Sequence, residues 1–168
     1  YLVCSGGAFQ NISLNQRLLH LGLKEVYIPC APNDAGLSLG AAVYLSMSLS
    51  HVRPNKYLTP FLGPKFNETE IENLLQEYKL KYERSNNISI DTATYISQGK
   101  IIGWFQGRSE LGPRALGARS IIADPRDHKM KDKINSGIKY REDFRPFAPA
   151  ILENMTTEYF DIADDEKV

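Results

Sequence analysis

The sequence predicts an α/β fold that contains a parallel, helix-covered sheet. In the first fifty residues a short apolar run, a turn and a helical pattern occur twice in succession, an order typical of parallel strands joined by helices. The composition agrees, because 42% hydrophobic and 24% charged residues are ordinary for a globular chain. The length of 168 residues suits one ordinary domain or two small ones.

The N-terminal elements follow from apolar runs and the residues that interrupt them. Residues 1–5 predict a buried strand that ends at a pair of glycines, and residues 13–21 carry leucines at helical spacing. Residues 26–28 predict a second short strand. Asn33 or Asp34 then stands where the cap of the next helix is expected.

The longest uncharged stretch, residues 35–50, predicts a buried helix. It is shorter than the roughly 20 residues that a membrane-spanning helix needs, so no membrane partner is expected. Cys4 and Cys30 are too few for a disulfide framework and lie in apolar surroundings, which favours thiols in a reducing, cytoplasmic compartment over a disulfide. The chain opens on Tyr1, without Met or leader and directly in the predicted strand, so we expect an excised piece of a longer protein.

The second half begins after a stretch rich in helix-breaking residues. Residues 52–66 contain three prolines and a glycine, which predicts a linker, and we place a domain boundary between domains 1–62 and 63–168. Asn67 is expected to open an amphipathic helix. The elements expected beyond it are a strand at 80–84, a helix at 91–98, strands at 101–105 and 120–123, and a helix at 127–137.

Two glycine-rich turns near the N-terminus are candidate ligand sites. Gly6, Gly7 and Asn11 stand between a predicted strand and helix, where backbone amides can approach a phosphate. Asp34, beside Gly36, lies in the corresponding second turn and offers a carboxylate to a metal. Each turn taken alone has a structural alternative, a tight turn for the first and an Asp helix cap for the second.

The strongest signal is an arginine-rich segment between residues 107 and 149. From residue 108 to 145, ten Lys and Arg residues face six Asp and Glu residues, although the whole chain has a formal net charge of zero. Arg108, Arg114 and Arg119 alternate with glycines and Pro113, which suits a pocket of guanidinium groups for phosphate. The alternative is a set of ion pairs that holds an irregular loop, and Arg126 beside Asp124 fits that alternative best.

These motifs together resemble those of the NodU/CmcH/TobZ O-carbamoyltransferases. The similarity covers nearly the whole chain in order, through the runs GG-x-x-x-N from residue 6, NDAG-x-x-x-GAA from residue 33, GRSE-x-GPRALG-x-RS from residue 107, ADPR from residue 123, and K-x-RE-x-FRPFAP from residue 139. The resemblance implies the end of an actin/sugar-kinase-like (ASKHA) domain, followed by part of a YrdC-like α/β domain.

The resemblance also implies an activity and its residues. The YrdC-like domain would activate carbamoyl phosphate with ATP and Mg²⁺ to carbamoyl-adenylate, and the ASKHA-like domain would transfer the carbamoyl group to a hydroxyl of a sugar, nodulation factor or antibiotic. Asp34 matches a ligand of Fe²⁺ or another divalent metal, whose histidine ligands would precede residue 1. The residues implied in catalysis are Arg108, Arg114 and Arg119, and those implied in substrate or nucleotide binding are Gly6, Gly7, Asn11, Gly36, Ser120, Lys139 and Arg145.

The competing interpretation is a non-catalytic RNA- or nucleotide-binding module that uses the arginine-rich, YrdC-like surface. A basic concavity can hold a phosphate backbone without chemistry. Exposed aromatic residues do not alternate with the basic residues, however, as a single-strand platform would require, so nucleic acid is not the expected partner. On the enzyme interpretation the isolated chain is expected to be inactive, the acceptor is unspecified, and a homodimer stays open as its assembly.

Overall fold

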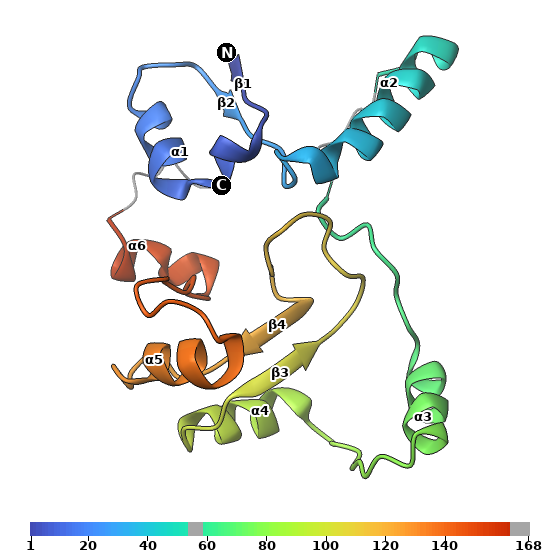
Figure 1. Ribbon diagram of the computed structural model, residues 1–168, viewed down its shortest axis with the longest axis vertical. Coiled ribbons are helices and arrows are strands. Elements are labelled where there is room, and N and C mark those ends of the chain that lie inside the picture. Colours follow the sequence, from blue (N-terminus) through green and yellow to red (C-terminus); the bar gives the residue numbers. More distant parts are fainter. Residues whose placement is uncertain (54–58, 162–168) are drawn as a thin grey trace. The chain divides into compact units, whose positions relative to one another are not determined.

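A computed structural model of the chain describes residues 1–53 and 59–161 (Figure 1). Contacts within the chain group it into two compact units: unit 1 comprises residues 1–83 and 104–120, and unit 2 comprises residues 84–103 and 121–168. The middle of the predicted 52–66 linker, including Pro54, lies outside the described residues. The domain boundary placed after residue 62 stays a prediction, because a grouping by contacts does not test separate domains.

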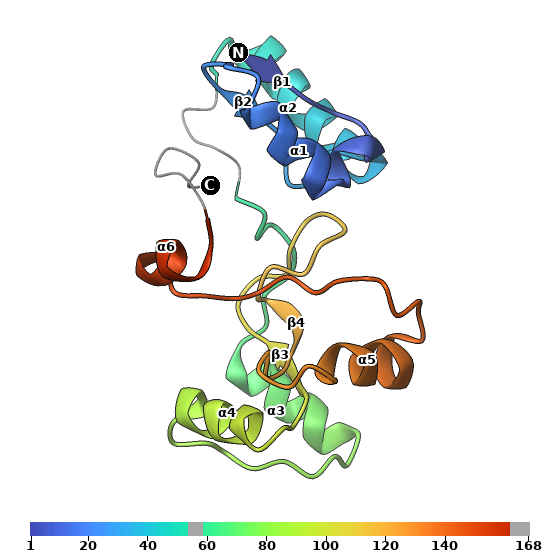
Figure 2. The ribbon, with the colours of Figure 1, turned by 90° about the vertical axis from the view of Figure 1, so that its left-hand side faces the viewer.

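Unit 1 begins with the predicted strand–helix–strand order. Strand β1 (Leu2–Val3) pairs in parallel with β2 (Val26–Tyr27), and helix α1 (Ile12–Leu19) connects them. Figures 1 and 2 show α1 beside this strand pair. The parallel arrangement confirms the α/β prediction, but the prediction of a wholly buried first strand is wrong: Cys4 is buried, whereas Val3 is 74% exposed.

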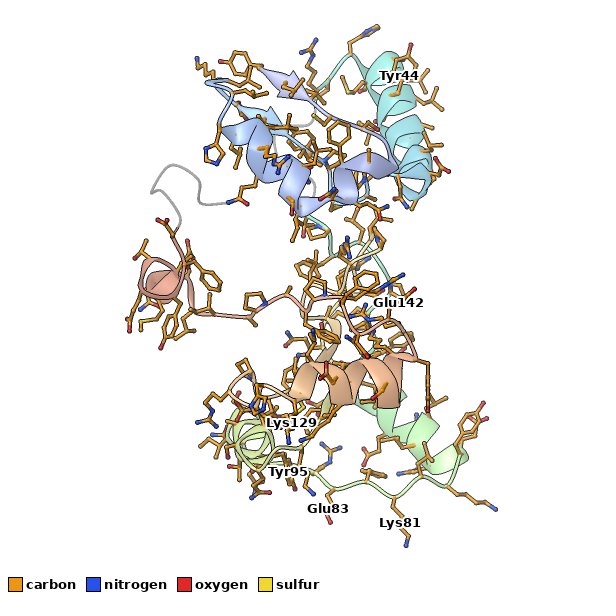
Figure 3. The ribbon with its side chains drawn as sticks, turned by 60° about the vertical axis from the view of Figure 1, so that its left-hand side comes forward. Tyr44, Lys81, Glu83, Tyr95, Lys129 and Glu142 are labelled. Atoms are coloured by element: carbon orange, nitrogen blue, oxygen red, sulfur yellow. The ribbon has the colours of Figure 1, made fainter. Side chains whose placement is uncertain are left out.

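Helix α2 (Leu37–Ser50) forms where the uncharged stretch predicts a helix, but the expectation of burial is wrong. None of its residues is buried, and Tyr44 on its outer side is 75% exposed (Figure 3). A helix that is apolar on every face needs neighbours on every face, and the elements described around α2 are too few to cover it. None of the described helices is both long enough and apolar enough to cross a membrane.

Helix α3 (Glu68–Glu77) begins as its cap predicts. The Asn67 side chain accepts a hydrogen bond from the Glu70 backbone amide, and the Glu70 carboxylate accepts one from the Asn67 amide. This reciprocal capping box satisfies two amides at the start of the helix. After α3 the left-handed backbone of Lys79, with φ of 53°, turns the chain, and residues 80–84 form no strand, so the strand predicted there is wrong.

Unit 2 contains α4 (Ile88–Ser97), which starts three residues before the predicted helix because Asn87 caps it. Strands β3 (Ile102–Phe105) and β4 (Arg119–Ile122) form a two-stranded sheet. The boundary between the two units falls inside each strand, after Gly103 in β3 and after Ser120 in β4. Their arrows run in opposite directions in Figure 1. Both strands lie within one residue of their predicted positions.

The predicted helix at 127–137 is formed in two parts, α5 (Met130–Ile134) and a π-helix (Asn135–Lys139). A 3₁₀ turn (Glu153–Met155) and α6 (Thr156–Tyr159) follow without having been predicted. The buried residues of unit 2 include Met130, Ile134 and Asn135. The chain is therefore a mixed α/β structure with two small sheets, and the ASKHA-like and YrdC-like assignments stay predictions.

Candidate functional site

The arginine loop, residues 107–120, connects β3 to β4 and is held against other parts of unit 1. Gly112 is one of its fixed points, with φ of 105° and no room for a side chain. A Cβ atom there would lie 2.6 Å from the Cys30 carbonyl oxygen. Because an L-residue would be both strained and in collision, the close approach of this loop to the Cys30–Ala31 turn requires glycine.

Glu110 organises the interior of the arginine loop. Its Oε1 atom accepts hydrogen bonds from the backbone amides of Leu116 (2.8 Å), Ala118 (2.8 Å) and Arg119 (3.2 Å). Burial raises the pKa of the Glu110 carboxyl, but these bonds and one from its own amide outweigh that effect and lower the pKa from 4.5 to about 2. Glu110 is therefore an ionised acceptor that binds backbone rather than a guanidinium group.

Arg108 and Arg114 keep their charge free of carboxylates. An Nη atom of Arg114 donates to the Gln10 carbonyl oxygen at 3.0 Å, and one of Arg108 donates to the Leu62 carbonyl oxygen at 3.1 Å. Both side chains are exposed, and within residues 1–53 and 59–161 neither forms an ion pair. A neutral carbonyl orients a guanidinium without cancelling its charge, so both arginines remain suited to bind an anion.

The Arg119 side chain binds the arginine loop and the residues packed beside it. Its guanidinium carbon lies 3.5 Å from the centroid of the Phe105 ring. Its Nη atoms donate to the backbone carbonyls of Gln106, Ala118, Gly107 and Pro64, at distances of 2.9 to 3.4 Å. Next to it, the Ser120 hydroxyl oxygen accepts a hydrogen bond from the Gly117 amide at 3.0 Å. Both side chains therefore brace the loop in this structure.

The first glycine turn lies within unit 1 with the arginine loop, and the Arg114–Gln10 bond joins them directly. Gly6 has φ of 113°, and its amide donates to the Pro32 carbonyl oxygen, so this amide is already used. Gly7 starts a 3₁₀ helix (Gly7–Gln10). The Asn11 side-chain oxygen caps α1 by accepting from the amides of Ser13 and Leu14, so Asn11 has the role of a helix cap here.

The second turn places Asp34 at the start of a 3₁₀ helix (Asp34–Gly36), exposed to solvent. Neither Asn33 nor Asp34 caps α2 through a side-chain hydrogen bond; Gly36 holds the cap position, so the expected cap is wrong. A Cβ atom at Gly36 would collide with the Ala31 carbonyl oxygen, which explains the glycine. The Asn33 Oδ1 atom is buried and has no hydrogen-bond partner among the described residues.

A metal centre is not formed by the described residues of this chain. In residues 1–53 and 59–161, no three His, Cys, Asp or Glu side chains gather closely enough to hold an ion. Asp34 by itself would supply one ligand, fewer than protein sites for divalent transition metals use. The described residues therefore form no complete site for the metal that the resemblance implies, and that metal remains a prediction.

Sequence reasoning assigned no role to Asn135, which organises the segment that follows it in unit 2. Asn135 is wholly buried (0% exposed), and its Nδ2 atom donates to the carbonyls of Asp143 (3.4 Å) and Arg145 (3.1 Å). Its Oδ1 atom accepts from Arg141 Nε at 2.8 Å. An asparagine on the buried side of a helix, two residues before Gly137, is the signal that could have indicated this role.

The segment beyond Asn135 lines an open hollow of about 420 Å³ on the surface. Its lining consists of Ser136, Tyr140, Arg141, Glu142, Asp143 and Arg145. Arg145 Nε is paired with the Glu142 carboxylate at 2.8 Å (Glu142 is labelled in Figure 3), and Lys139 is an exposed residue at the end of the π-helix. Lys139 and Arg145 belong to unit 2, so a pocket that they share with the arginine loop stays a prediction.

Comparison with known proteins gives one family and several relatives. Residues 93–168 match the family model described as "Carbamoyltransferase C-terminus". The chain is 44% identical to nodulation protein NolO of Bradyrhizobium diazoefficiens (97% of this chain, 31% of that protein), 40% identical to nodulation protein NolNO of Sinorhizobium fredii (99% and 25%), and 34% identical to nodulation protein U of Azorhizobium caulinodans (99% and 28%). The chain thus spans about a quarter to a third of the length of these relatives.

Proposed function

The chain belongs to the NodU-type carbamoyltransferase family, and we propose that it contributes to an enzyme that activates carbamoyl phosphate with ATP and carbamoylates a hydroxyl group. The activity is proposed for the complete protein, because the chain spans only 31% of NolO and 25% of NolNO. We propose that the isolated chain is inactive. The acceptor is a hydroxylated small molecule such as a sugar, nodulation factor or antibiotic.

The proposed reaction has two steps whose atoms balance. In the first, a carbamoyl oxygen bonds to the α-phosphorus of Mg²⁺-bound ATP and pyrophosphate leaves; one water is consumed, and the phosphoryl group of carbamoyl phosphate is released as inorganic phosphate. In the second, the acceptor hydroxyl oxygen bonds to the carbamoyl carbon, its proton is lost, and AMP leaves. Negative charge accumulates on the departing pyrophosphate, so fixed cations favour the first step.

The observation that supports this proposal is the unpaired charge of the arginine loop. Arg108 and Arg114 are oriented by backbone carbonyls and form no ion pair in the described part of the chain. The one carboxylate of the loop, that of Glu110, accepts hydrogen bonds from backbone amides instead. A loop with only a structural role would be expected to pair Glu110 with a guanidinium, as Asp124 pairs with Arg126 at 2.6 Å. We propose that Arg108 and Arg114 contact phosphate and that Arg119 holds the loop in shape.

Further residues enter the proposal through their match to the family motifs. Gly6, Gly7, Asn11 and Gly36 are proposed to line the nucleotide site of the transfer step, and Ser120, Lys139 and Arg145 to line the activation site. Asp34 is proposed as one ligand of iron or another divalent metal whose other ligands lie elsewhere in the complete protein. Asp34→Asn should then lower the bound iron measured by elemental analysis, and unchanged iron content would leave Asp34 a turn residue.

The proposed function is tested by assaying pyrophosphate release from ATP with the complete protein. Release should require carbamoyl phosphate and should yield carbamoyl-AMP when the acceptor is omitted. The matched control replaces carbamoyl phosphate with inorganic phosphate. Equal pyrophosphate release in the control would contradict the proposal. Sub-micromolar RNA binding with a steep salt dependence and no such release would instead favour a nucleic-acid module.

A further inference from the structure

Glu110 lies in a basic loop but binds none of the arginines through their side chains. The bonds that it accepts come from residues six, eight and nine positions further along the chain, and they span the turn that carries Arg114. Gly112 and Gly117 flank that turn with φ of 105° and 100°. Two glycines with this freedom would leave the turn many conformations, so the three bonds to one carboxylate atom help to select a single one.

Building on the proposed function, we propose that Glu110 is a positioning residue for phosphate binding: its carboxylate holds the arginine loop in the shape that presents Arg114 to an anion. The carboxylate occupies three backbone amides that would otherwise need water or another partner. Because these amides satisfy Glu110, it does not neutralise Arg108, Arg114 or Arg119. The side chain acts through the loop and does not contact the ligand.

Charge repulsion and positioning predict opposite changes in anion affinity when the Glu110 carboxylate is removed. A carboxylate near an anion site repels the anion, so Coulomb's law alone predicts that removing it strengthens anion binding. Positioning predicts the opposite, because loss of the carboxylate releases the turn and disperses the orientation of Arg114. The direction of the change in affinity therefore separates the two effects.

The first experiment measures binding of inorganic pyrophosphate to the complete protein by calorimetry. Glu110→Gln should raise the dissociation constant roughly tenfold, because an amide oxygen is a weaker acceptor than a carboxylate and its NH₂ group faces backbone donors. Asp132→Asn removes the same charge from an exposed side chain whose ion pair with Lys131 spans 4.0 Å, so it is the matched control and should leave binding unchanged or slightly tighter. Unchanged or tighter binding by Glu110→Gln would overturn the proposal.

A second variant changes the same turn without changing its charge. Gly117 has φ of 100° and open space where a Cβ atom would lie, so Gly117→Ala adds backbone strain but no collision. It should weaken pyrophosphate binding as Glu110→Gln does. Gly99→Ala, with φ of 77° at the end of α4 in unit 2, adds similar strain elsewhere and should not affect pyrophosphate. If both glycine variants weaken binding equally, the effect is general destabilisation and positioning is excluded.

A last comparison shows whether Glu110 acts through Arg114. In an Arg114→Ala background, Glu110→Gln should change pyrophosphate affinity less than twofold, because the group that it positions is gone. A full tenfold loss in that background would overturn the link to Arg114. All of these readouts are binding constants, so they remain decisive even if the complete protein does not release pyrophosphate in a carbamoyl-phosphate-dependent reaction and the proposed function fails.

Discussion

The arginine loop of unit 1 and the Asn135 segment of unit 2 (residues 135–147) are held in shape by different kinds of side chain, a charged carboxylate in the first and a neutral amide in the second. In the first, the Glu110 carboxylate accepts hydrogen bonds from three backbone amides. In the second, the wholly buried Asn135 donates to two backbone carbonyls and accepts from Arg141. Each loop is thus closed by a single polar residue with several backbone partners.

The two regions also differ in the partners of their arginine side chains. In the Asn135 segment, Arg145 is paired with the Glu142 carboxylate, whereas Arg141 donates to the neutral Asn135 amide and its guanidinium carbon lies 4.7 Å from the Phe147 ring centroid. In the arginine loop, Arg108 and Arg114 meet only carbonyl oxygens among the described residues. The two regions are similarly rich in arginine, so the number of arginines alone does not identify an anion site; their partners do.

The largest effect on stability is expected at Asn135. Asn135→Ala removes three side-chain hydrogen bonds from a buried position and leaves their partners unsatisfied, which should lower the free energy of unfolding by about 3 kcal/mol. Urea denaturation of the complete protein measures the change. A loss below about 1 kcal/mol would mean that water replaces the amide and that Asn135 does not organise its segment.

The next effect is the loss of stability of the arginine loop as the pH falls. The folded-state pKa of Glu110, about 2, lies below its ordinary value of 4.5, so its ionised form adds stability that is present above pH 4.5 and is lost as pH falls toward 2. The Asp124 carboxyl, whose pKa Arg126 lowers to about 2, behaves in the same way. Wild type and Glu110→Gln should therefore differ most in thermal stability above pH 4.5 and converge toward pH 2. Parallel curves throughout would contradict the Glu110 assignment.

A smaller effect on stability is expected at an asparagine of the surface. Asn67→Ala removes the exposed capping box of α3 and should cost about 1 kcal/mol, clearly less than Asn135→Ala. Urea denaturation of both variants under the same conditions checks this order. Equal losses would show that burial of Asn135 adds nothing to its hydrogen bonds.

The smallest effect is expected at an arginine that has a carboxylate partner. The Asp124 carboxylate accepts several hydrogen bonds from Arg126, whose side chain is 74% exposed. Arg126→Lys should change carbamoyl-phosphate-dependent pyrophosphate release less than about threefold, because an arginine whose charge is already paired with a carboxylate is poorly suited to bind an anion. A tenfold or larger loss would place Arg126 at the anion site and remove the distinction between paired and unpaired arginines.

Local signals predicted much of the fold. Asn67 caps α3 where a helix start was predicted, and β2, β3 and β4 lie within one residue of their predicted positions, because caps and apolar runs act over a few residues. The caps at Asn11 and Asn87 were not predicted. The ion pair of Arg126 with Asp124 was also predicted from their proximity in the sequence and is confirmed.

Features that depend on tertiary partners could not be predicted from the sequence. Glu110 reaches residues 116–119 only because left-handed glycines fold the loop back, and spacing alone does not reveal that path. The exposure of α2 contradicts its apolar composition because burial depends on neighbouring elements. The same holds for the absent strand at 80–84, where no described partner strand supplies hydrogen bonds.

The central claim is that the unpaired Arg114 stabilises the departing pyrophosphate, and a comparison of half-reactions in the complete protein tests it most directly. Arg114→Lys keeps the charge but loses the planar fork, so carbamoyl-phosphate-dependent pyrophosphate release should fall about 100-fold, or about 3 kcal/mol. Transfer from pre-made carbamoyl-adenylate should stay within about twofold of wild type, because pyrophosphate has already left that substrate. Equal losses in both half-reactions, with the fold preserved by circular dichroism, would contradict the assignment of the arginine loop to activation.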